Sequence, residues 1–457
     1  MMTDLHELSI GAVKTRFFAR SLKPSDYLAA LLTRLAAYDD AIHSMIAIDS
    51  ARANAAAFEA DAAYAAGAPR GPLDGIPVAI KDVIDVAGLP TTCYSRLLLD
   101  NIAARDAAAV SALRRAGAII LGKSATHEFA IGGPAFDLPF PPARNPWNVA
   151  HHPGGSSSGS GAGVAAGFFP AAIGTDTGGS VRHPASACGI VGLKPTYDVI
   201  SRSGVFPLAF SLDHVGSLAR TVADAALLCD VMAEGRTAAT HQIGQPIRGV
   251  KVGYVKHFHT ADMIADTEVT EALDAAAMRL VDLGAEVREI TLPSLLAFAA
   301  VNRIMLQSEA IAVHGKWLRE TPEAYCRLSR RSILPGVFLS AEDLIQTQRR
   351  RRQLIDAVEA AFGDVDILLT ASSMETACRI DDEAEIAHTY GRQARTPFNV
   401  TGHPAIALRS GMSRAGLPLS LQIAGRYHDE ALICRVAAAI ELPSEIPPLD
   451  TTQFAAT

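Results

Sequence analysis

Strand-like and helix-like segments alternate along the first half of this chain, and this alternation constrains the fold most strongly. The stretch GIPVAIKDVIDVAG (75–88) is an apolar β-type run bounded by glycines, and AVSALRRAGAIILGK (109–123) has the pattern of a helix, a glycine turn and a strand. FFPAAIGTDTGGS (168–180) has the pattern of a strand followed by a loop. Strands alternating with helices predict an α/β fold, with helices on both faces of a large twisted sheet that is predominantly parallel or mixed; we expect a mixed sheet.

The same texture continues towards the C-terminus, so we expect one domain over residues 1–457. Helices are expected within about 1–66, with Ser25 as the cap of one of them, and the core of the sheet within about 70–230. The stretch 292–362 is mostly helical in pattern and is expected to form a cap-like region within the domain. Looser repeats of the pattern predict further elements at 249–255, 267–287 and 364–371.

Composition places the chain among ordinary globular proteins and argues against several function classes. Its 457 residues, 49% hydrophobic and 19% charged, can bury a large core. A net charge of −7 offers no basic footprint for nucleic acid or an anionic membrane. The N-terminal segment lacks the apolar core of a signal peptide, and no run approaches the roughly 20 apolar residues of a membrane span. We therefore expect a cytoplasmic protein without nucleic acid or membrane partners.

Metal and disulfide chemistry are not expected. The six cysteines are scattered without CxxC spacing, so we expect them to be reduced and buried. The histidine pairs at 151–152 and 257–259 lack a third ligand at helical spacing. The pair His-Glu at 127–128 begins an HExxH motif, but Ile131 occupies its fifth position. The prediction is therefore no metal and no cofactor.

Two further motifs match by letter but not by context. GAIILGKS (117–124) fits the phosphate-loop pattern, yet its middle residues are strand formers suited to burial rather than to a loop of exposed amides. GSSSG (155–159) fits the nucleophile elbow of α/β-hydrolases around Ser157, but a proline-broken loop precedes it instead of a strand. The run RRRR (349–352) is expected to be the solvated face of a helix.

Three separated segments make chemical sense together. Lys81 follows the apolar run IPVAI, where lost hydration can lower the pKa of an amine enough to provide a base; pairing with Asp82 is the structural alternative. GGSSSGS (154–160) leads into a segment of small residues that can pack closely on a sheet. GTDTGGS (174–180) can turn successive amides towards a developing oxyanion, with Ser180 presented as nucleophile.

These segments resemble the amidase signature enzymes. The resemblance runs from about residue 5 to 440 and rests on GIPVAIKD, PGGSSSGS, GTDTGGSVRHPASACGIVGLKPT, SRSGVFPLAFSLDHVGSLART, TPFNVTGHPAIALRSG and GLPLSLQIAGR. It implies a hydrolase of α/β fold, distinct from the α/β-hydrolases, with a Ser-Ser-Lys triad: Ser180 as the acylated nucleophile, Ser156 as the bridging serine after a cis peptide bond, and Lys81 as the base. It also implies oxyanion or substrate-binding positions at Ala130, Thr177, Gly178, Gly179 and Ser180.

The resemblance implies hydrolysis of a carboxamide-type C–N bond in an amide, anilide or carbamate, and also of esters, as in amidases, aryl acylamidases and urethanases. The aromatic and proline-rich stretch 129–147, with Leu306, Phe338 and Leu339 as expected walls, favours a hydrophobic or aryl acyl group. The alternative is the glutaminase component of a tRNA-dependent amidotransferase complex. The partner otherwise expected is a small-molecule amide, ester or carbamate, and a homodimer is left open.

Overall fold

Eleven strands form one mixed sheet in the computed structural model, which describes residues 5–449. Their order across the sheet is β1-β3-β2-β4-β6-β5-β10-β11-β9-β7-β8. β2 is parallel to β3 and β4, whereas β4, β6, β5, β10, β11 and β9 follow one another in antiparallel pairs. The predicted mixed α/β sheet is therefore confirmed. The strands are β1 Met45–Ile48, β2 Pro77–Lys81, β3 Ile119–Ser124, β4 Ala171–Asp176, β5 Val191–Lys194, β6 His214–Ala219, β7 Lys251–Tyr254, β8 Glu286–Glu289, β9 Ile367–Ala371, β10 Ala405–Met412 and β11 Pro418–Gly425.

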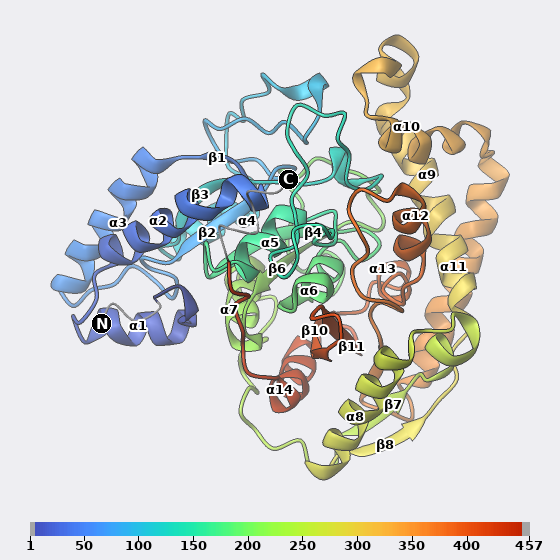
Figure 1. The fold of residues 1–457 in the computed structure, drawn as a ribbon. Helices are drawn as coiled ribbons and strands as arrows, with labels where there is room; N and C mark the ends of the chain where they lie inside the picture. Colours follow the sequence, from blue (N-terminus) through green and yellow to red (C-terminus); the bar gives the residue numbers. More distant parts are fainter. Residues whose placement is uncertain (1–4, 450–457) are drawn as a thin grey trace.

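Helices surround this sheet. In Figure 1, α1, α2 and α3 lie at one end of the molecule beside β1 and β3, and α9, α10 and α11 lie at the other end. The helices are α1 Ile10–Phe18, α2 Pro24–Ile42, α3 Ser50–Ala65, α4 Ala108–Arg115, α5 Ser158–Ala165, α6 Arg182–Cys188, α7 Val222–Ala233, α8 Thr267–Asp282, α9 Leu295–Glu320, α10 Arg327–Ile333, α11 Ala341–Ala361, α12 Glu383–Gly391, α13 Pro397–Val400 and α14 Glu430–Ile440.

Successive residues of the central strands belong to two different apolar clusters, because side chains alternate across a strand. In β2, Val78 and Ile80 pack into one cluster and Ala79 into the other. Helices α4, α7, α8 and α14 contribute to the first cluster, and α2, α3, α5 and α6 contribute to the second. Both faces of the sheet are therefore covered, and the strand ends are left as the place where polar groups can gather.

The predicted N-terminal helices are present, but the expected cap is wrong. α2 begins at Pro24, with Lys23 in the N-cap position. Proline suits the first helical position because its φ is already helical and its missing N–H would have no partner there. Ser25 instead donates from its hydroxyl to the carboxylate of Asp61 in α3. This serine therefore ties two helices together rather than starting one.

The long helix α9 belongs to the helical region predicted over 292–362. By length and composition it is the one helix of the described chain that could cross a membrane. It packs against α10, α11 and α13, and its Asn302 side chain donates to the carbonyl of Thr177 at 3.1 Å. Since α9 holds a loop at the edge of the sheet, it acts here as a packing element of the globular fold.

The structure also explains why the misleading motifs carry no matching chemistry. Residues 119–124 form β3, between β1 and β2, so this segment is a buried strand rather than a phosphate-binding loop. A loop, not a strand, precedes Ser157. Within 349–352, three arginines are exposed as predicted, but Arg351 is half-buried and donates to the carbonyl of Val400 at 2.6 Å. That arginine joins α11 to the end of α13.

Candidate active site

Lys81 is the last residue of β2, and its side chain is fully buried. Its Nζ lies 2.8 Å from Ser156 Oγ and 2.8 Å from Thr175 Oγ1. Because β2 and β4 are neighbouring parallel strands, Lys81 and Thr175 reach the same edge of the sheet. The fold thus brings an amine and a serine hydroxyl together from distant segments.

The amine of Lys81 has no carboxylate within ion-pair distance in the described chain. Asp82, the next residue, pairs instead with Lys123, with 3.1 Å between Oδ1 and Nζ. Burial lowers the pKa of Lys81 to about 7, although the more distant carboxylates of Asp176 and Asp213 oppose this shift. A substantial fraction of this amine is therefore neutral near pH 7 and able to accept a proton.

Ser156 lies in a tightly packed loop just before α5. The peptide bond between Gly155 and Ser156 is cis. The carbonyl of Ser156 accepts hydrogen bonds from the amide of His127 at 3.1 Å and from Thr126 Oγ1 at 2.9 Å. A Cβ at Gly155 would lie 2.0 Å from the imidazole of His127, so only glycine fits at this position. These contacts fix the position of the Ser156 hydroxyl.

Ser180 ends the loop that follows β4. Its carbonyl accepts a hydrogen bond from the amide of Ser157 at 3.2 Å, which joins the two serine loops. The amide of Gly179 was predicted to be free for an oxyanion, but it donates to Asp176 Oδ1 at 2.8 Å and is already engaged. The loop amides that have no partner within the described residues are those of Thr177, Gly178 and Ser180.

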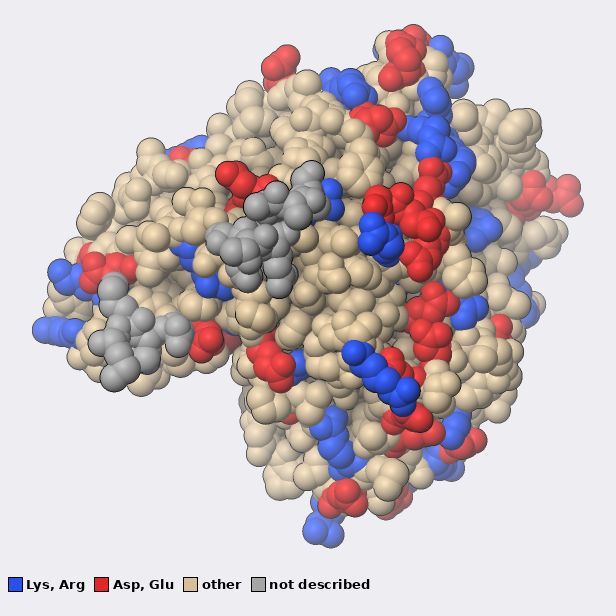
Figure 2. All heavy atoms as spheres, in the orientation of Figure 1, with Lys and Arg blue, Asp and Glu red and all other residues tan. Residues whose placement is uncertain are grey.

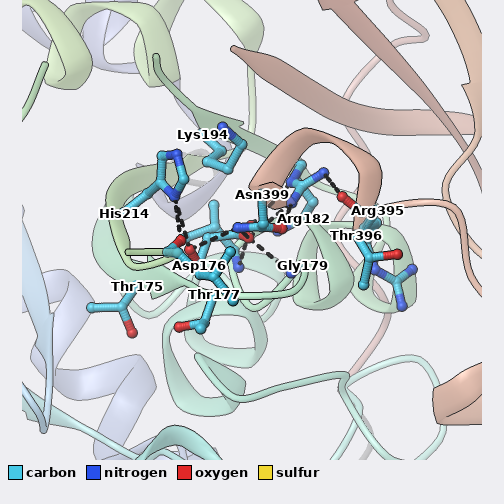
Figure 3. A network of polar contacts seen from close by, with 12 residues as sticks. Thr175, Asp176, Thr177, Gly179, Arg182, Lys194, His214, Arg395, Thr396 and Asn399 are labelled. Carbon is cyan, nitrogen blue, oxygen red and sulfur yellow. Dashed lines mark hydrogen bonds and ion pairs between the residues drawn. The ribbon is translucent and has the colours of Figure 1, made fainter. Parts of the chain in front are cut away.

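A buried carboxylate, Asp176, holds this loop in shape (Figure 3). It accepts from Arg182 Nε at 3.0 Å and Nη2 at 2.8 Å, and from Asn399 Nδ2 at 2.8 Å. Burial opposes ionisation of Asp176, but the Arg182 guanidinium and these hydrogen bonds outweigh it and keep its pKa well below the usual range. Charge-assisted bonds of this kind are short and directional. Asp176 therefore positions the loop that carries Ser180.

The other end of the loop is held at Thr177. Its hydroxyl donates to Asp213 Oδ1 at 2.6 Å, and Asn302 binds its carbonyl from α9. Burial raises the pKa of Asp213 to about 6, because the hydrogen bonds from Thr177 and from the backbone offset only part of the cost of burying its charge. Contacts with Asp176, Asp213 and Asn302 thus hold the loop of residues 177–180 in place.

One cavity of about 160 Å³ collects most of the predicted site residues. Ser156 and Ser180 line it, as do all four predicted substrate-binding positions: Ala130, Thr177, Gly178 and Gly179. Lys81 is not on the cavity wall and is linked to it by Ser156. Both serines therefore lie on the cavity wall, and the amine of Lys81 lies behind it in the core.

The backbone at Ala130 is unusual. Ala130 has a φ of 63° and its neighbour Phe129 a φ of 50°, both in the left-handed region that residues with a Cβ seldom adopt. The ring of Phe129 is buried among aromatic groups, 4.5 Å between centroids from His314 of α9. Such strain persists only where surrounding packing imposes it, and it recurs at ligand-binding positions.

The remaining wall of the cavity is partly apolar and partly polar. Of the expected walls, Leu306 is confirmed, but Phe338 is 88% exposed on the surface and Leu339 does not line the cavity. No aromatic residue of 129–147 lines it either. The expectation of an aryl pocket built from these rings is therefore wrong. The other lining side chains are Ile131, Leu208, His127, His183, Tyr390, Gln393 and Arg395.

Within the described residues, no group of three or more His, Cys, Asp or Glu side chains is arranged to hold a metal ion. Glu128, which belongs to the incomplete HExxH motif, accepts a hydrogen bond from Ser95 Oγ at 2.7 Å. Burial lowers the pKa of His127 to about 3, so its imidazole is neutral at pH 7. The six cysteines are all buried, as predicted.

Comparison with known proteins now places the chain. The family model described as Amidase matches residues 26–434. The chain belongs to the amidase family. A relative from Roseiflexus sp. (strain RS-1), named as a subunit of glutamyl-tRNA(Gln) amidotransferase, is 36% identical, and the alignment covers 96% of this chain and 97% of the relative.

Two solved structures of the amidase family extend the comparison. The native peptide amidase from Stenotrophomonas maltophilia superposes with a TM-score of 0.84 at 27% identity, covering 97% of this chain and 99% of that one. The corresponding glutamyl-tRNA(Gln) amidotransferase subunit from Thermotoga maritima gives a TM-score of 0.81 at 28% identity, covering 98% and 99%. The amidase-family fold therefore spans the chain, and the chain is an amidohydrolase of the amidase signature type.

The prediction of a small-molecule partner and no nucleic acid is wrong for this amidase-family chain. The relatives from Roseiflexus and Thermotoga carry names that specify a subunit and a tRNA. Net charge failed as a criterion because it averages over the whole surface, and a subunit can meet nucleic acid through its partners. On the face shown in Figure 2, basic and acidic side chains are interspersed.

Several residues of the amidase-family site were not found from the sequence. Thr175 and Asp176 lie inside the segment GTDTGGS, and their place at the end of a strand was the available signal. Tyr390 and Arg395 had no local signal, because they reach the cavity only through the packing of α12 and α13. The motifs thus contain the candidate reacting groups, and tertiary packing supplies much of the cavity wall.

Proposed function

We propose that this chain hydrolyses a carboxamide-type C–N bond through an acyl-enzyme formed on Ser180. The observation that carries the proposal is the 2.8 Å approach of Lys81 Nζ to Ser156 Oγ, with Ser156 and Ser180 lining one cavity. An amine with a pKa near 7 and no carboxylate partner can act as a base at neutral pH. Ser156 can pass a proton between that amine and the nucleophile.

In this mechanism the proton travels inward and then returns. Ser180 Oγ bonds to the carbonyl carbon while its proton passes to Ser156 and the Ser156 proton passes to Lys81. The carbonyl oxygen gains negative charge, which the unpartnered amides of Thr177 and Gly178 can stabilise. When the C–N bond breaks, the relay returns the proton to the leaving nitrogen, since an amide anion leaves poorly. Water then repeats the attack, releasing the acid and restoring Ser180.

A serine-directed fluorophosphonate tests this proposal directly. We expect the reagent to label the wild-type chain and the Ser157→Ala variant, which alters the serine next to Ser156, but not the Ser180→Ala variant. Amide hydrolysis by Ser180→Ala should fall by at least about 10⁴-fold, as for other nucleophile deletions. Labelling that survives in Ser180→Ala would rule out Ser180 as the nucleophile.

We further propose that the amide is glutamine and that the chain supplies ammonia as a subunit of a tRNA-dependent amidotransferase. Support comes from the names of relatives such as those from Roseiflexus and Thermotoga, which align over nearly their whole length. The small cavity also suits a short primary carboxamide better than a drug-sized ligand.

Reconstitution tests the glutamine assignment. The chain, alone and mixed with the other subunits of the amidotransferase, is incubated with glutamine, glutamyl-tRNA(Gln) and ATP, which activates the glutamyl carboxylate for attack by ammonia. We expect ammonia release to rise on mixing and amidated tRNA to form. Absence of amidated tRNA with every partner present would contradict the assignment.

The second candidate is hydrolysis of linear amides, anilides, carbamates or esters. The observation that favours it is the apolar part of the wall, formed by Ile131, Leu208 and Leu306, together with the similarity to peptide amidase. A panel of aliphatic amides, anilides, aryl esters, carbamates and glutamine separates the candidates, with Ser180→Ala as control. Preference for glutamine supports the role in an amidotransferase, and preference for any other substrate supports this second candidate.

A further inference from the structure

Arg395 is a buried cation on the wall of the catalytic cavity. It lies two residues before α13, is 2% exposed, and lines the cavity next to Gly179. Its Nη1 donates to the carbonyl of Ser372 at 2.9 Å and to Ser373 Oγ at 2.6 Å. Its Nε is buried and has no hydrogen-bond partner among the described residues. Protein groups therefore hold one end of the guanidinium and leave a donor unused.

Arg182 has a carboxylate partner, and Arg395 does not have one among the described residues. Arg182 is also buried, but its Nη2 lies 2.8 Å from Asp176 Oδ1. In the described chain no carboxylate lies within 4.0 Å of the Arg395 guanidinium. Burial and then the nearby charge of Arg182 lower the pKa of Arg395 to about 9, so it still carries its proton at pH 7. A buried charge without a counter-charge is costly, and an anionic ligand would relieve that cost.

The rest of the cavity wall adds no opposing charge. Among its described residues there is no Asp or Glu, and Arg395 is the only Lys or Arg. Burial lowers the pKa of His183 well below its ordinary value, so this lining imidazole is neutral at pH 7, as is that of His127. The cavity therefore presents one full positive charge and no negative one.

We propose that the acyl part of the substrate carries a carboxylate that binds Arg395 while its amide carbonyl meets Ser180. This inference rests on the proposed acyl transfer at Ser180. A Cβ at Gly179 would lie 2.6 Å from Arg395 Nε, so the cation stands beside the residue that precedes the nucleophile, and the spacer must be short. The substrate class is the monoamides of short dicarboxylic acids, such as malonamate, succinamate and glutaramate. Glutamine belongs to it through its α-carboxylate.

Binding to the Ser180→Ala protein tests the carboxylate without any need for turnover. Calorimetry compares glutaramate with pentanamide, which has a methyl group where glutaramate has its carboxylate. We expect glutaramate to bind at least about 30-fold more tightly, since charge-assisted bidentate bonds to arginine exceed neutral contacts. Equal affinities, or no binding of glutaramate at millimolar concentration, would overturn the proposal.

Variants at Arg395 test whether this residue causes the preference for glutaramate over pentanamide. In the Ser180→Ala background, Arg395→Gln should bring the two affinities together, and Arg395→Lys should keep part of the difference because it retains charge but not the planar fork. The matched control is Arg414→Gln, whose side chain is 91% exposed, and it should keep the original ratio. If Arg395→Gln weakened both ligands equally, the arginine would be structural and the proposal would be refuted.

Failure of this inference can be told apart from failure of the proposed function. Fluorophosphonate labelling reports on Ser180 and involves no carboxylate. A chain that is labelled but does not discriminate between glutaramate and pentanamide refutes only the anion site. A chain that discriminates but is not labelled refutes the Ser180 chemistry and supports the anion site.

Discussion

Two buried lysines on neighbouring strands differ in one respect. Lys123 of β3 lies 3.1 Å from the carboxylate of Asp82, whereas the amine of Lys81 in β2 meets, among residues 5–449, only oxygens of Ser156 and Thr175. A buried amine paired with a carboxylate is held as an ion pair, and one without such a partner gives up its proton more readily. The difference teaches that the partner, rather than burial alone, separates a structural lysine from one suited to base chemistry.

Two arginines near the cavity show the same difference between a paired and an unpaired cation. Arg182 neutralises Asp176 and shapes the loop that carries Ser180, while Arg395 has no carboxylate and stands on the cavity wall. In both cases the paired cation supports the backbone and the unpaired cation is available to chemistry or ligand. Substitutions on either side of this contrast should therefore have opposite effects on rate and stability.

Lys81→Met should give the largest effect. Removing the base is expected to lower kcat for amide hydrolysis by about 10⁴-fold, at the upper end for general base catalysis, because this amine has no substitute within the site. The free energy of unfolding at pH 7 should not fall, since methionine has a similar volume, no ion pair is lost and the cost of burying the amine is removed. Steady-state kinetics and urea unfolding measure the two quantities. A variant that keeps a tenth of wild-type kcat would contradict the assignment.

Lys123→Met should lower the stability of the fold, unlike Lys81→Met, whose main effect is on kcat. It leaves the buried carboxylate of Asp82 unpaired, so we expect the free energy of unfolding to fall by about 3–5 kcal/mol. Urea unfolding measures this loss. The double variant Lys123→Met with Asp82→Asn should recover part of the stability, because no buried charge remains. A loss below about 1 kcal/mol would show that the pair does not have this structural role.

The pH dependence of kcat/KM should follow Lys81. Below its pKa of about 7 the amine is protonated, so the rate should fall about tenfold for each pH unit and level off above pH 7. Rates measured between pH 5 and 9, with chemistry shown to limit turnover by single-turnover kinetics, test this. A flat profile across that range would argue against an amine base.

Stability should respond to the same pKa, but above pH 7 rather than below it. The pKa of Lys81 is lowered from 10.5 in the unfolded chain to about 7 in the fold, so between these values the unfolded chain binds more protons. The contribution of this group therefore rises with pH by up to about 1.4 kcal/mol per unit from pH 7 and is flat below it. The difference between the unfolding free energies of wild type and Lys81→Met should therefore change between pH 7 and 9. Parallel curves would show that the amine is not perturbed.

Thr175→Val should give the smallest effect. It removes the hydroxyl that lies 2.8 Å from Lys81 Nζ and keeps the shape of the side chain. One hydrogen bond of this kind contributes about 1 kcal/mol, so kcat should fall by roughly three- to tenfold. A loss of more than a hundredfold in steady-state assays would mean that Thr175 takes part in the relay.

Much of the reacting centre could be predicted from the sequence because it is encoded in short continuous motifs. GGSSSGS and GTDTGGS each place a serine by its position within a loop, and the apolar run before Lys81 marks a buried strand. The motif could not tell that the amide of Gly179 is taken by Asp176, because that depends on how the loop folds back on itself. It also could not decide that Asp82 pairs with Lys123, which follows from the parallel pairing of β2 with β3.

The cavity wall was less predictable, since apolar residues near a motif can be buried in the hydrophobic core instead of lining the cavity. Phe129 is buried and packs against α9, and Phe338 lies on the surface. Tyr390 and Arg395 lie more than two hundred residues after Ser180 and reach the cavity through α12 and α13. No local pattern marks a side chain whose role depends on such distant packing.

The cavity draws its residues from several separate stretches of the chain, and this has a use in engineering. The groups assigned to bond cleavage all fall within 81–180, whereas Leu306, Tyr390, Gln393 and Arg395 come from later segments. A mutant library confined to these four later positions can search for acceptance of new acids while every atom of the cleavage apparatus is retained. Directed evolution of selectivity can therefore begin without repairing turnover at each round.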